Sequence, residues 1–283
     1  MIIFKRVIRI VSYVLFAFCI VGLVFCAASS DKLDIVSYTI KSAEADFSCL
    51  VISDYHHRSL NFENGNMINI LKKQESVDYV FITGDLIDSH TKSLNDVNEI
   101  LDAADKISDH CYFVTGNHEE YAPLWPSLKT LISSKEGVTY LENMDVTSGN
   151  IHIVGIDDAR FKVGGGASFK AREEANKEAL SKFTLSPDKF NILLMHRPEN
   201  FKMVANDFSD FDLVISGHTH GGQFRLGNWV PTSIFLEEGE YMGGKYHLKN
   251  TDLVVSRGLG YSAMFPLRVN CNPEIVKITV NSN

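Results

Sequence analysis

The residues best suited to chemistry are two histidines in the stretch SGHTHGGQ, residues 216–223. His218 and His220 follow an apolar run, and two glycines come directly after them. A polar surface loop would use the glycines without needing histidine, and such a loop is the plain structural alternative. Two imidazoles at this spacing favour a metal site, where glycine lets backbone and substrate approach closely.

Other apolar runs of the chain end in the same kinds of side chain. Taken singly, each such residue has a structural explanation as a turn, a helix cap or a buried histidine. The chain has ten histidines, and five of them fall at these run ends, which chance placement does not account for. The run ends carry Asp54 and His56, Asp85 and Asp88, Asn117 with His118 and Glu119, His196, and finally His218 with His220.

The donor types indicate which ions such a site would bind. Imidazole, carboxylate and amide donors without thiolate suit Mn, Fe, Zn, Co or Ni rather than calcium. The donors are too many for one small site, whereas two ions that share a bridging carboxylate would use them all. Two ions about 3.5–4 Å apart are suited to hydrolysing phosphate esters.

Alternating strands and helices must position these residues. Strand-like runs followed by helix-period segments predict a layered α/β fold, with the site at the carboxyl ends of the strands. From residue 222 onward, alternating patterns predict antiparallel strands, so either one mixed sheet or two sheets are expected. The strand-like runs cover 49–53, 79–83, 111–115, 151–156, 191–196 and 212–216, and the helix-period segments cover 65–74, 93–107, 124–134 and 170–182.

Composition limits the class of partner. The chain has 283 residues, is 45% hydrophobic and 22% charged, and carries a formal net charge of −8. This balance offers no basic face for duplex nucleic acid, which is therefore a poor candidate partner. An acidic protein that handles phosphates needs metal ions to offset the repulsion. Without a linker or repeat, one domain is predicted over 34–283, and the oligomeric state is left open.

The N-terminus predicts a membrane segment over 1–30. Lys5, Arg6 and Arg9 precede an uncharged run over 10–28, which as a helix would be about 28 Å long and would cross a bilayer. The preceding positive charges place the N-terminus in the cytoplasm and the domain outside the cell membrane. A cleaved signal peptide is the alternative, and a lipid-modified Cys26 is a third possibility.

Cysteine usage excludes two further kinds of site. Cys49, Cys111 and Cys271 lie far apart, without a CxxC spacing, and the other two cysteines lie in the apolar N-terminal run. Neither a disulfide framework nor a zinc–thiolate site is expected, and Cys49 and Cys111 are predicted to be buried as small apolar residues.

Taken together and in order, the motifs resemble those of calcineurin-like metallophosphoesterases over roughly residues 45–280. The resemblance implies a four-layer α/β/β/α sandwich of two mixed sheets with helices outside, which the strand pattern alone does not reach. GHTHGGQFRL, GIDD (155–158) and VSRGLG (255–260) resemble the small membrane-associated bacterial branch of that superfamily. The five ordered motifs are DYH (54–56), GDLID (84–88), GNHE (116–119), MH (195–196) and GHTH (217–220).

The resemblance also implies a role for each matching position. Two divalent ions would be bound, and a hydroxide between them would attack the phosphorus of a phosphomonoester or phosphodiester. The implied first ion is held by Asp54, His56 and His220, and the second by Asn117, His196 and His218, with Asp85 bridging, His118 as the acid or substrate-stabilising group, and Asp88 orienting His118.

Several positions depart from the family pattern or lack a role in it. Tyr55 stands where the family usually has an apolar residue, and His57 is either a substrate contact or merely exposed. Arg197 and Arg257 could equally meet phosphate oxygens or form ion pairs. Structural roles are expected for His90, His110, His152 and His247, whereas Asp157 and Asp158 are expected to form a turn and to support the ligands without binding metal themselves.

The leading hypothesis is a membrane-anchored, two-metal phosphoester hydrolase. The anchor raises the further idea of a lipid-linked phosphate substrate. From a different class, the chain could be a catalytically silent, membrane-anchored metal-binding scaffold or sensor. Loss of His118 or Asn117 would favour that alternative, and both residues are present.

Overall fold

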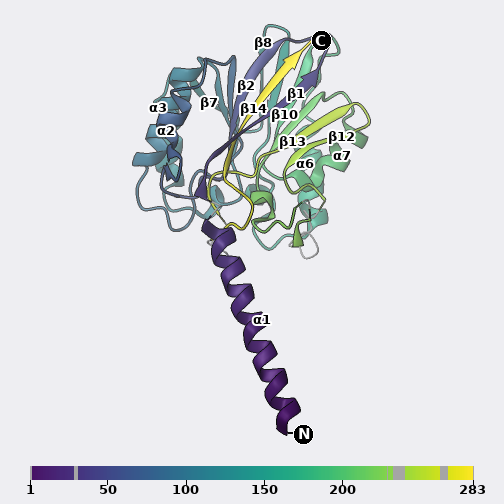
Figure 1. Ribbon diagram of the computed structural model, residues 1–283. Coiled ribbons are helices and arrows are strands. Elements are labelled where there is room, and N and C mark those ends of the chain that lie inside the picture. Colours follow the sequence, from purple (N-terminus) through teal and green to yellow (C-terminus); the bar gives the residue numbers. More distant parts are fainter. Residues whose placement is uncertain (1, 29–30, 228, 232–239, 262–266, 283) are drawn as a thin grey trace.

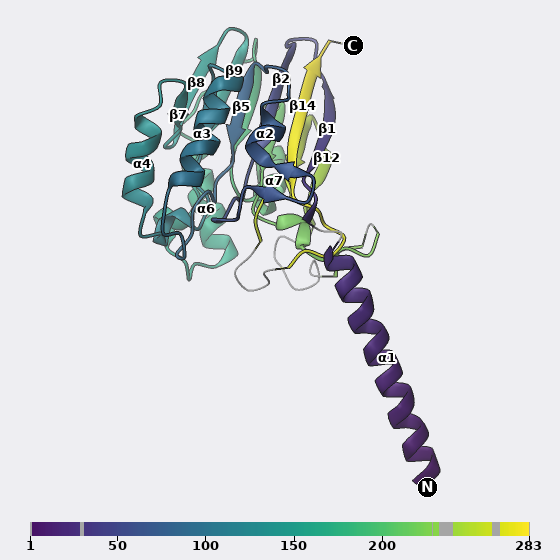
Figure 2. The same ribbon diagram turned by 60° about the vertical axis from the view of Figure 1, so that its left-hand side comes forward.

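Two six-stranded sheets lie face to face in the computed structural model, with helices outside both (Figures 1 and 2). The structure describes residues 2–28, 31–227, 229–231, 240–261 and 267–282. Helices α2 (Met67–Leu71), α3 (Asn95–Ile107) and α4 (Trp125–Ser133) cover the first sheet, and α6 (Phe169–Leu180) and α7 (Phe201–Asp207) cover the second. The four-layer α/β/β/α sandwich implied by the resemblance is confirmed.

Both sheets are mixed. In the first, the order is β1 (Asp34–Lys41), β14 (Glu274–Asn281), β2 (Phe47–Ile52), β5 (Tyr79–Ile82), β6 (Cys111–Phe113) and β7 (Val138–Tyr140). In the second, it is β12 (Gly244–Leu248), β13 (Thr251–Val255), β11 (Leu213–Ser216), β10 (Phe190–Leu194), β9 (Ile151–Gly155) and β8 (Met144–Ser148). Only the β14–β2, β12–β13 and β8–β9 pairings are antiparallel in these two sheets.

Short elements complete the described fold. They are the ribbon β3 (Asn61–Phe62) and β4 (Gly65–Asn66), helix α5 (Arg160–Val163), and the 3₁₀ turns η2 (Glu119–Tyr121), η3 (Pro198–Asn200) and η4 (His220–Gly222).

The central strands are apolar throughout because each buries both of its faces. In β5, Val80 and Ile82 pack toward the outer helices, whereas Tyr79 and Phe81 pack into the layer between the sheets. Successive side chains of a strand point to opposite faces, so a strand between two apolar layers must be apolar at every position. The core therefore consists of one layer between the sheets and one under each set of helices.

Every predicted strand-like run contains a strand, but the first predicted helix is too long. The helix expected over 65–74 is α2 alone, because residues 65–66 form β4 and the Asn66 side chain caps the helix by accepting from Ile68 N at 3.0 Å. Strands β1, β7 and β8 and helix α7 were not predicted from the sequence. They are short or lie at sheet edges, where the periodic signal is weak.

The N-terminal helix α1 (Ile2–Ala28) lies outside the sandwich. Its segment Phe4–Val24 is long and apolar enough to cross a membrane, and none of it is buried. Such a helix could be a membrane anchor or a signal sequence. Ser29 and Ser30, the last residues of the membrane segment predicted over 1–30, lie outside the described residues.

Candidate metal centre

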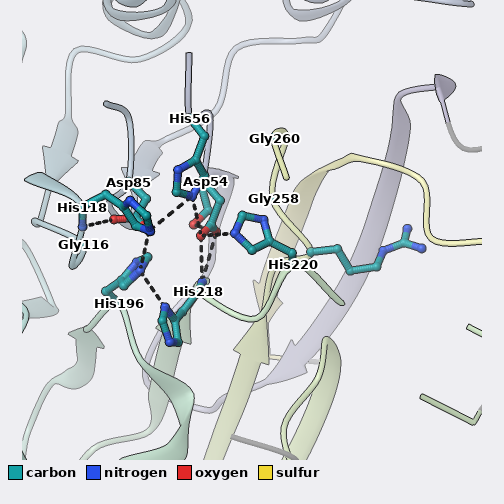
Figure 3. Close-up of polar contacts among 12 residues, drawn as sticks. Asp54, His56, Asp85, Gly116, His118, His196, His218, His220, Gly258 and Gly260 are labelled. Atoms are coloured by element: carbon teal, nitrogen blue, oxygen red, sulfur yellow. Dashed lines mark hydrogen bonds and ion pairs between the residues drawn. The ribbon is translucent and has the colours of Figure 1, made fainter. Parts of the chain in front are cut away.

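The carboxyl ends of five strands meet at the end of the sandwich where α1 joins it (Figure 1). Asp54 follows β2, Asp85 follows β5, and Asn117 follows β6. From the second sheet, His196 follows β10 and the GHTH motif (217–220) follows β11. The close-up in Figure 3 shows the side chains of both sheets turned toward one another across this edge. The fold thus brings six of the seven predicted ligands together, and both chain neighbours of the seventh, Asn117, contact Asp85.

The backbone turns sharply at most of these positions. Asp54, His56, Asp85, His218 and His220 all have positive φ angles, between 47° and 73°. This region is unfavourable for residues other than glycine and is held only where the surroundings determine it, which is common at functional sites. The turns direct the side chains to the common edge instead of letting them alternate as in a strand.

Glycine is required where the loops after β5 and β6 touch. A Cβ atom on Gly84 would lie 2.3 Å from Gly116 N, and one on Gly116 would lie 2.2 Å from Asp85 Oδ1. No side chain fits at either position unless the loops separate. The close approach places the bridging candidate Asp85 against the loop that carries Asn117.

Asp85 lies at the middle of the cluster. Its Oδ2 atom is 3.3 Å from His56 Nε2, 3.1 Å from His196 Nε2 and 4.0 Å from His118 Nε2. Three groups have candidate ligand atoms within 4.8 Å of one another: Asp54 with His56 and His220, His56 with Asp85 and His118, and Asp85 with His196 and His218.

Several buried donor atoms in this cluster make no hydrogen bond. They are both ring nitrogens of His56, Nδ1 of His220 and Oδ1 of Asn117. A buried polar atom without a partner costs roughly 1–3 kcal/mol, so such atoms are rare unless they have a use. The amide oxygen and one nitrogen of each neutral imidazole carry lone pairs of the types that bind transition metals, so the residues fit divalent ions.

The protonation states of Asp85 and His220 also suit ligation. Burial opposes ionisation of Asp85, but the imidazoles of His196 and His56 outweigh it and hold the pKa of this carboxyl well below its usual range. Burial lowers the pKa of His220 well below its usual value, and the positive charges of His56 and Arg268 add to this effect. An anionic carboxylate and a neutral imidazole are the forms that bind metal.

His118 lies at the open edge of the centre. Its side chain is 23% exposed, and its Nδ1 bonds the Tyr121 hydroxyl. Burial lowers the pKa of His118 to about 4, so the ring is neutral at physiological pH. In the described part of the chain no hydrogen bond joins His118 to Asp88. That carboxylate accepts from His90 N at 2.7 Å and lies 3.9 Å from His56 Nδ1, so its orienting role stays a prediction.

Glu119 has a structural role that the sequence motifs did not predict. Its buried carboxylate accepts from the backbone N–H groups of Asp85 at 2.9 Å, Gly116 at 2.8 Å and Ile87 at 3.2 Å. Burial raises the pKa of Glu119 to about 7, and the negative charge of Asp85 contributes to this rise. The carboxylate thereby holds together two loops that carry candidate ligands.

Arg268 was missed altogether, because nothing in its local sequence marks it. It is buried, and its guanidinium donates to the carbonyl groups of Arg257 at 2.7 Å, Gly260 at 2.8 Å and His220 at 3.3 Å. Burial lowers its pKa to about 10. Only the assembled fold shows that this cation ties the His220 loop to the VSRGLG segment (255–260).

The structure distinguishes the two other arginines. Arg257 forms ion pairs, since its guanidinium lies 2.6 Å from Glu274 and 3.4 Å from Asp34. Arg197 reaches the centre, because Nε donates to Asp158 at 2.7 Å and a terminal nitrogen lies 2.8 Å from His218 Nε2. Asp158 therefore lies behind the centre, with Arg197 between it and a candidate ligand.

The remaining sequence expectations concern residues away from the ligands. Tyr55 packs in the core and its hydroxyl donates to Asp96 at 2.9 Å. His57, His90, His110 and His247 are exposed, His152 bonds Asn191 and Asp145, and Asp157 accepts from Thr115 and Tyr140. Cys49, Cys111 and Cys271 are buried free thiols, whereas the side chain of Cys26 lies outside the described set.

Comparison with known proteins adds an independent observation. The family model described as calcineurin-like phosphoesterase matches residues 47–222. An uncharacterized metallophosphoesterase of Campylobacter jejuni is 32% identical over 267 residues, covering 93% of this chain and 67% of that protein. One of Aquifex aeolicus is 30% identical over 258 residues, covering 88% and 92%.

Other similar proteins are longer or more distant. The chain spans half the length of a Helicobacter pylori metallophosphoesterase, to which it is 34% identical over 211 residues. A zebrafish protein named as a transmembrane protein with a metallophosphoesterase domain is 30% identical over 212 residues, with 72% of this chain and 46% of that protein covered. The structure of phosphopantetheinyl hydrolase from Mycobacterium tuberculosis superposes with a TM-score of 0.43 at 13% identity, covering 75% and 89%.

Proposed function

The chain belongs to the calcineurin-like phosphoesterase family, and we propose that it hydrolyses phosphoester bonds with two divalent metal ions. The observation that carries the proposal is the position of Asp85. Its Oδ2 lies close to His56 on one side and His196 on the other, as a bridging carboxylate would. A carboxylate shared by two ligand groups is the arrangement that a dinuclear centre requires.

The remaining ligands divide around Asp85. We assign one ion to Asp54, His56 and His220, and the other to Asn117, His196 and His218. When bound, such ions polarise a phosphoryl oxygen and lower the pKa of a water molecule so that it can attack phosphorus. The identity of the ions is open among Mn, Fe, Zn, Co and Ni.

Other groups of the protein orient the candidate ligands and the substrate. The backbone carbonyl of Thr83 accepts from His196 Nδ1 at 2.7 Å, so Nε2 is the nitrogen of that ring that would bind a metal ion. His118 is neutral and lies at the open edge, where its Nε2 can donate to a phosphoryl or leaving-group oxygen. A catalytically silent metal-binding scaffold or sensor would not need this donor.

The reaction would take place at a membrane if α1 is retained. We propose that α1 is a single-pass anchor with a cytoplasmic N-terminus, because Lys5, Arg6 and Arg9 precede its uncharged part. Phosphomonoesters and phosphodiesters both remain candidate substrates.

Metal-dependent turnover tests the proposal directly. The full chain in detergent, stripped of metal and reloaded with Mn, should hydrolyse bis-p-nitrophenyl phosphate or p-nitrophenyl phosphate only when reloaded. Asp85→Asn should lose both bound metal and turnover, whereas Asp188→Asn, at an exposed loop position, should keep both. Full activity in Asp85→Asn would overturn the assignment.

A further inference from the structure

The polypeptide that leaves α1 rejoins the body beside the metal centre. The side chain of Asp31 pairs with the guanidinium of Arg58, two residues after His56. The Asp31 carbonyl accepts from Glu63 N at 2.9 Å. Leu33 exchanges backbone hydrogen bonds with the Asn64 side chain at 2.9 and 2.8 Å. Asp31, where the chain from α1 meets the domain, is thus fixed against the loop that begins at the candidate ligand His56.

Chain length limits how far this attachment point can stand from a membrane. Two residues separate the end of α1 at Ala28 from Asp31, so three Cα–Cα steps join them, and these span at most about 11 Å when fully extended. The apolar segment ends at Val24, and the helical residues beyond it add about 6 Å. With α1 in a bilayer, Asp31 lies within about 17 Å of the hydrocarbon edge, whatever path residues 29 and 30 take.

Exposed apolar side chains lie at the same end of the sandwich. The apolar rim, as we name it, consists of Leu226, Trp229 and Leu267, which are 60%, 54% and 38% exposed. Outside α1, Leu226 and Trp229 are the two most exposed large apolar side chains of the described residues. Their backbones exchange hydrogen bonds at 2.9 and 3.2 Å, which fixes them at one tip.

The apolar rim is joined directly to a metal ligand. Phe224 pairs with Val269, so the segment that carries the tip and the segment that carries Leu267 run side by side. Arg268, next to Leu267, donates to the carbonyl of His220 at 3.3 Å. In both ribbon views the green segment after η4 lies beside the end of the sandwich where α1 joins it (Figures 1 and 2).

We infer that the apolar rim rests in the interface of the bilayer that holds α1, so that the metal centre opens toward the membrane surface. Trp favours the membrane–water interface, and Leu favours the hydrocarbon just below it. Because α1 already holds the domain close to the bilayer, even a small apolar contact suffices to orient the domain. On the proposed function, the substrate is then a phosphoester presented by the lipid headgroup layer.

Tryptophan fluorescence tests the contact without requiring catalysis. The chain has two tryptophans, so Trp125→Phe in the full chain leaves Trp229 as the only reporter. In phosphatidylcholine liposomes with brominated acyl chains, Trp229 should lose most of its emission relative to ordinary lipid. The matched variant Trp229→Phe reports on Trp125, which packs among Phe113, Tyr140 and Phe161 and should be quenched little.

Two results would overturn the inference. In one, Trp229 emits equally in both lipids while aqueous iodide quenches it, which means that the domain stands off the membrane. In the other, carbonate extracts the full chain from the liposomes, which means that α1 does not anchor it. Either result leaves metal-dependent turnover in detergent unaffected, so failure of this inference is distinguishable from failure of the proposed hydrolase.

A second arm uses substrate presentation. Leu226→Ser should reduce turnover of phosphatidic acid in liposomes several-fold relative to turnover of soluble bis-p-nitrophenyl phosphate or p-nitrophenyl phosphate. The control Met144→Ser removes a similarly exposed apolar side chain, 53% exposed on the edge strand β8, and should not change the ratio. An unchanged ratio in Leu226→Ser would argue that the apolar rim does not present membrane substrates.

Discussion

Asp85 Oδ2 and His196 Nε2 lie 3.1 Å apart, and both side chains are almost completely buried. Burial disfavours a charged imidazole, but the Asp85 carboxylate outweighs it and raises the pKa of His196 to about 10. The proton on His196 therefore occupies the position where we assign a metal ion. Proton and metal compete for the same lone pair, which ties the stability of the metal-free protein to pH.

The metal-free protein should lose stability as the pH rises from about 6.5 to about 10. A histidine whose folded pKa lies above its unfolded value of about 6.5 contributes stability that is fully present below that value. This contribution is lost as the pH rises through the folded pKa. Urea unfolding midpoints across this range measure the effect. The metal-loaded protein should lack the loss, and equal pH profiles for the two forms would contradict the competition.

Gly116→Ala should abolish metal binding without unfolding the chain. The added Cβ would lie 2.2 Å from Asp85 Oδ1, so the bridging carboxylate must move away from the histidines. Gly166→Ala is the matched control, because nothing lies within 4 Å of its added Cβ. Mass spectrometry of bound metal and circular dichroism together measure the outcome. A Gly116→Ala protein that still binds two ions would refute the bridging position of Asp85.

Glu119→Gln should destabilise the protein by roughly 1–3 kcal/mol and weaken metal binding. The carboxylate accepts three backbone N–H groups, whereas a glutamine has one acceptor oxygen and turns an N–H₂ group toward a donor. Glu120→Gln, at the neighbouring exposed position, provides the control. Chemical denaturation and metal titration measure both effects, and an unchanged metal affinity would show that the loops do not depend on this tie.

Arg268→Lys should loosen the His220 loop. The three guanidinium nitrogens each donate to a different carbonyl, those of Gly260, His220 and Arg257, and the single nitrogen of an ammonium cannot reach all three. Loss of two buried hydrogen bonds corresponds to about 1–3 kcal/mol of stability, together with weaker binding of the ion assigned to His220. Arg160→Lys, in a partly exposed pair with Glu120, should change neither property. Equal metal affinities in the two variants would exclude the positioning role.

The sequence by itself determined the types of the candidate ligands and the elements that carry them. A buried strand is a continuous apolar run, and a polar side chain directly after it, as at Asp54, Asp85 and His196, is visible without any structure. The charge-free run over 10–28 likewise indicated a helix long enough to cross a membrane, because length and composition alone define that signal.

Only the tertiary structure decided how these pieces meet. The last strand, β14, lies between β1 and β2, a pairing across more than 200 residues that no local pattern encodes. Glu119 and Arg268 act through backbone groups of distant segments, so their own neighbours in the sequence carry no sign of the role. Local periodicity reports burial and secondary structure, whereas strand order, buried polar contacts and the position of α1 beside the metal centre depend on contacts between distant segments.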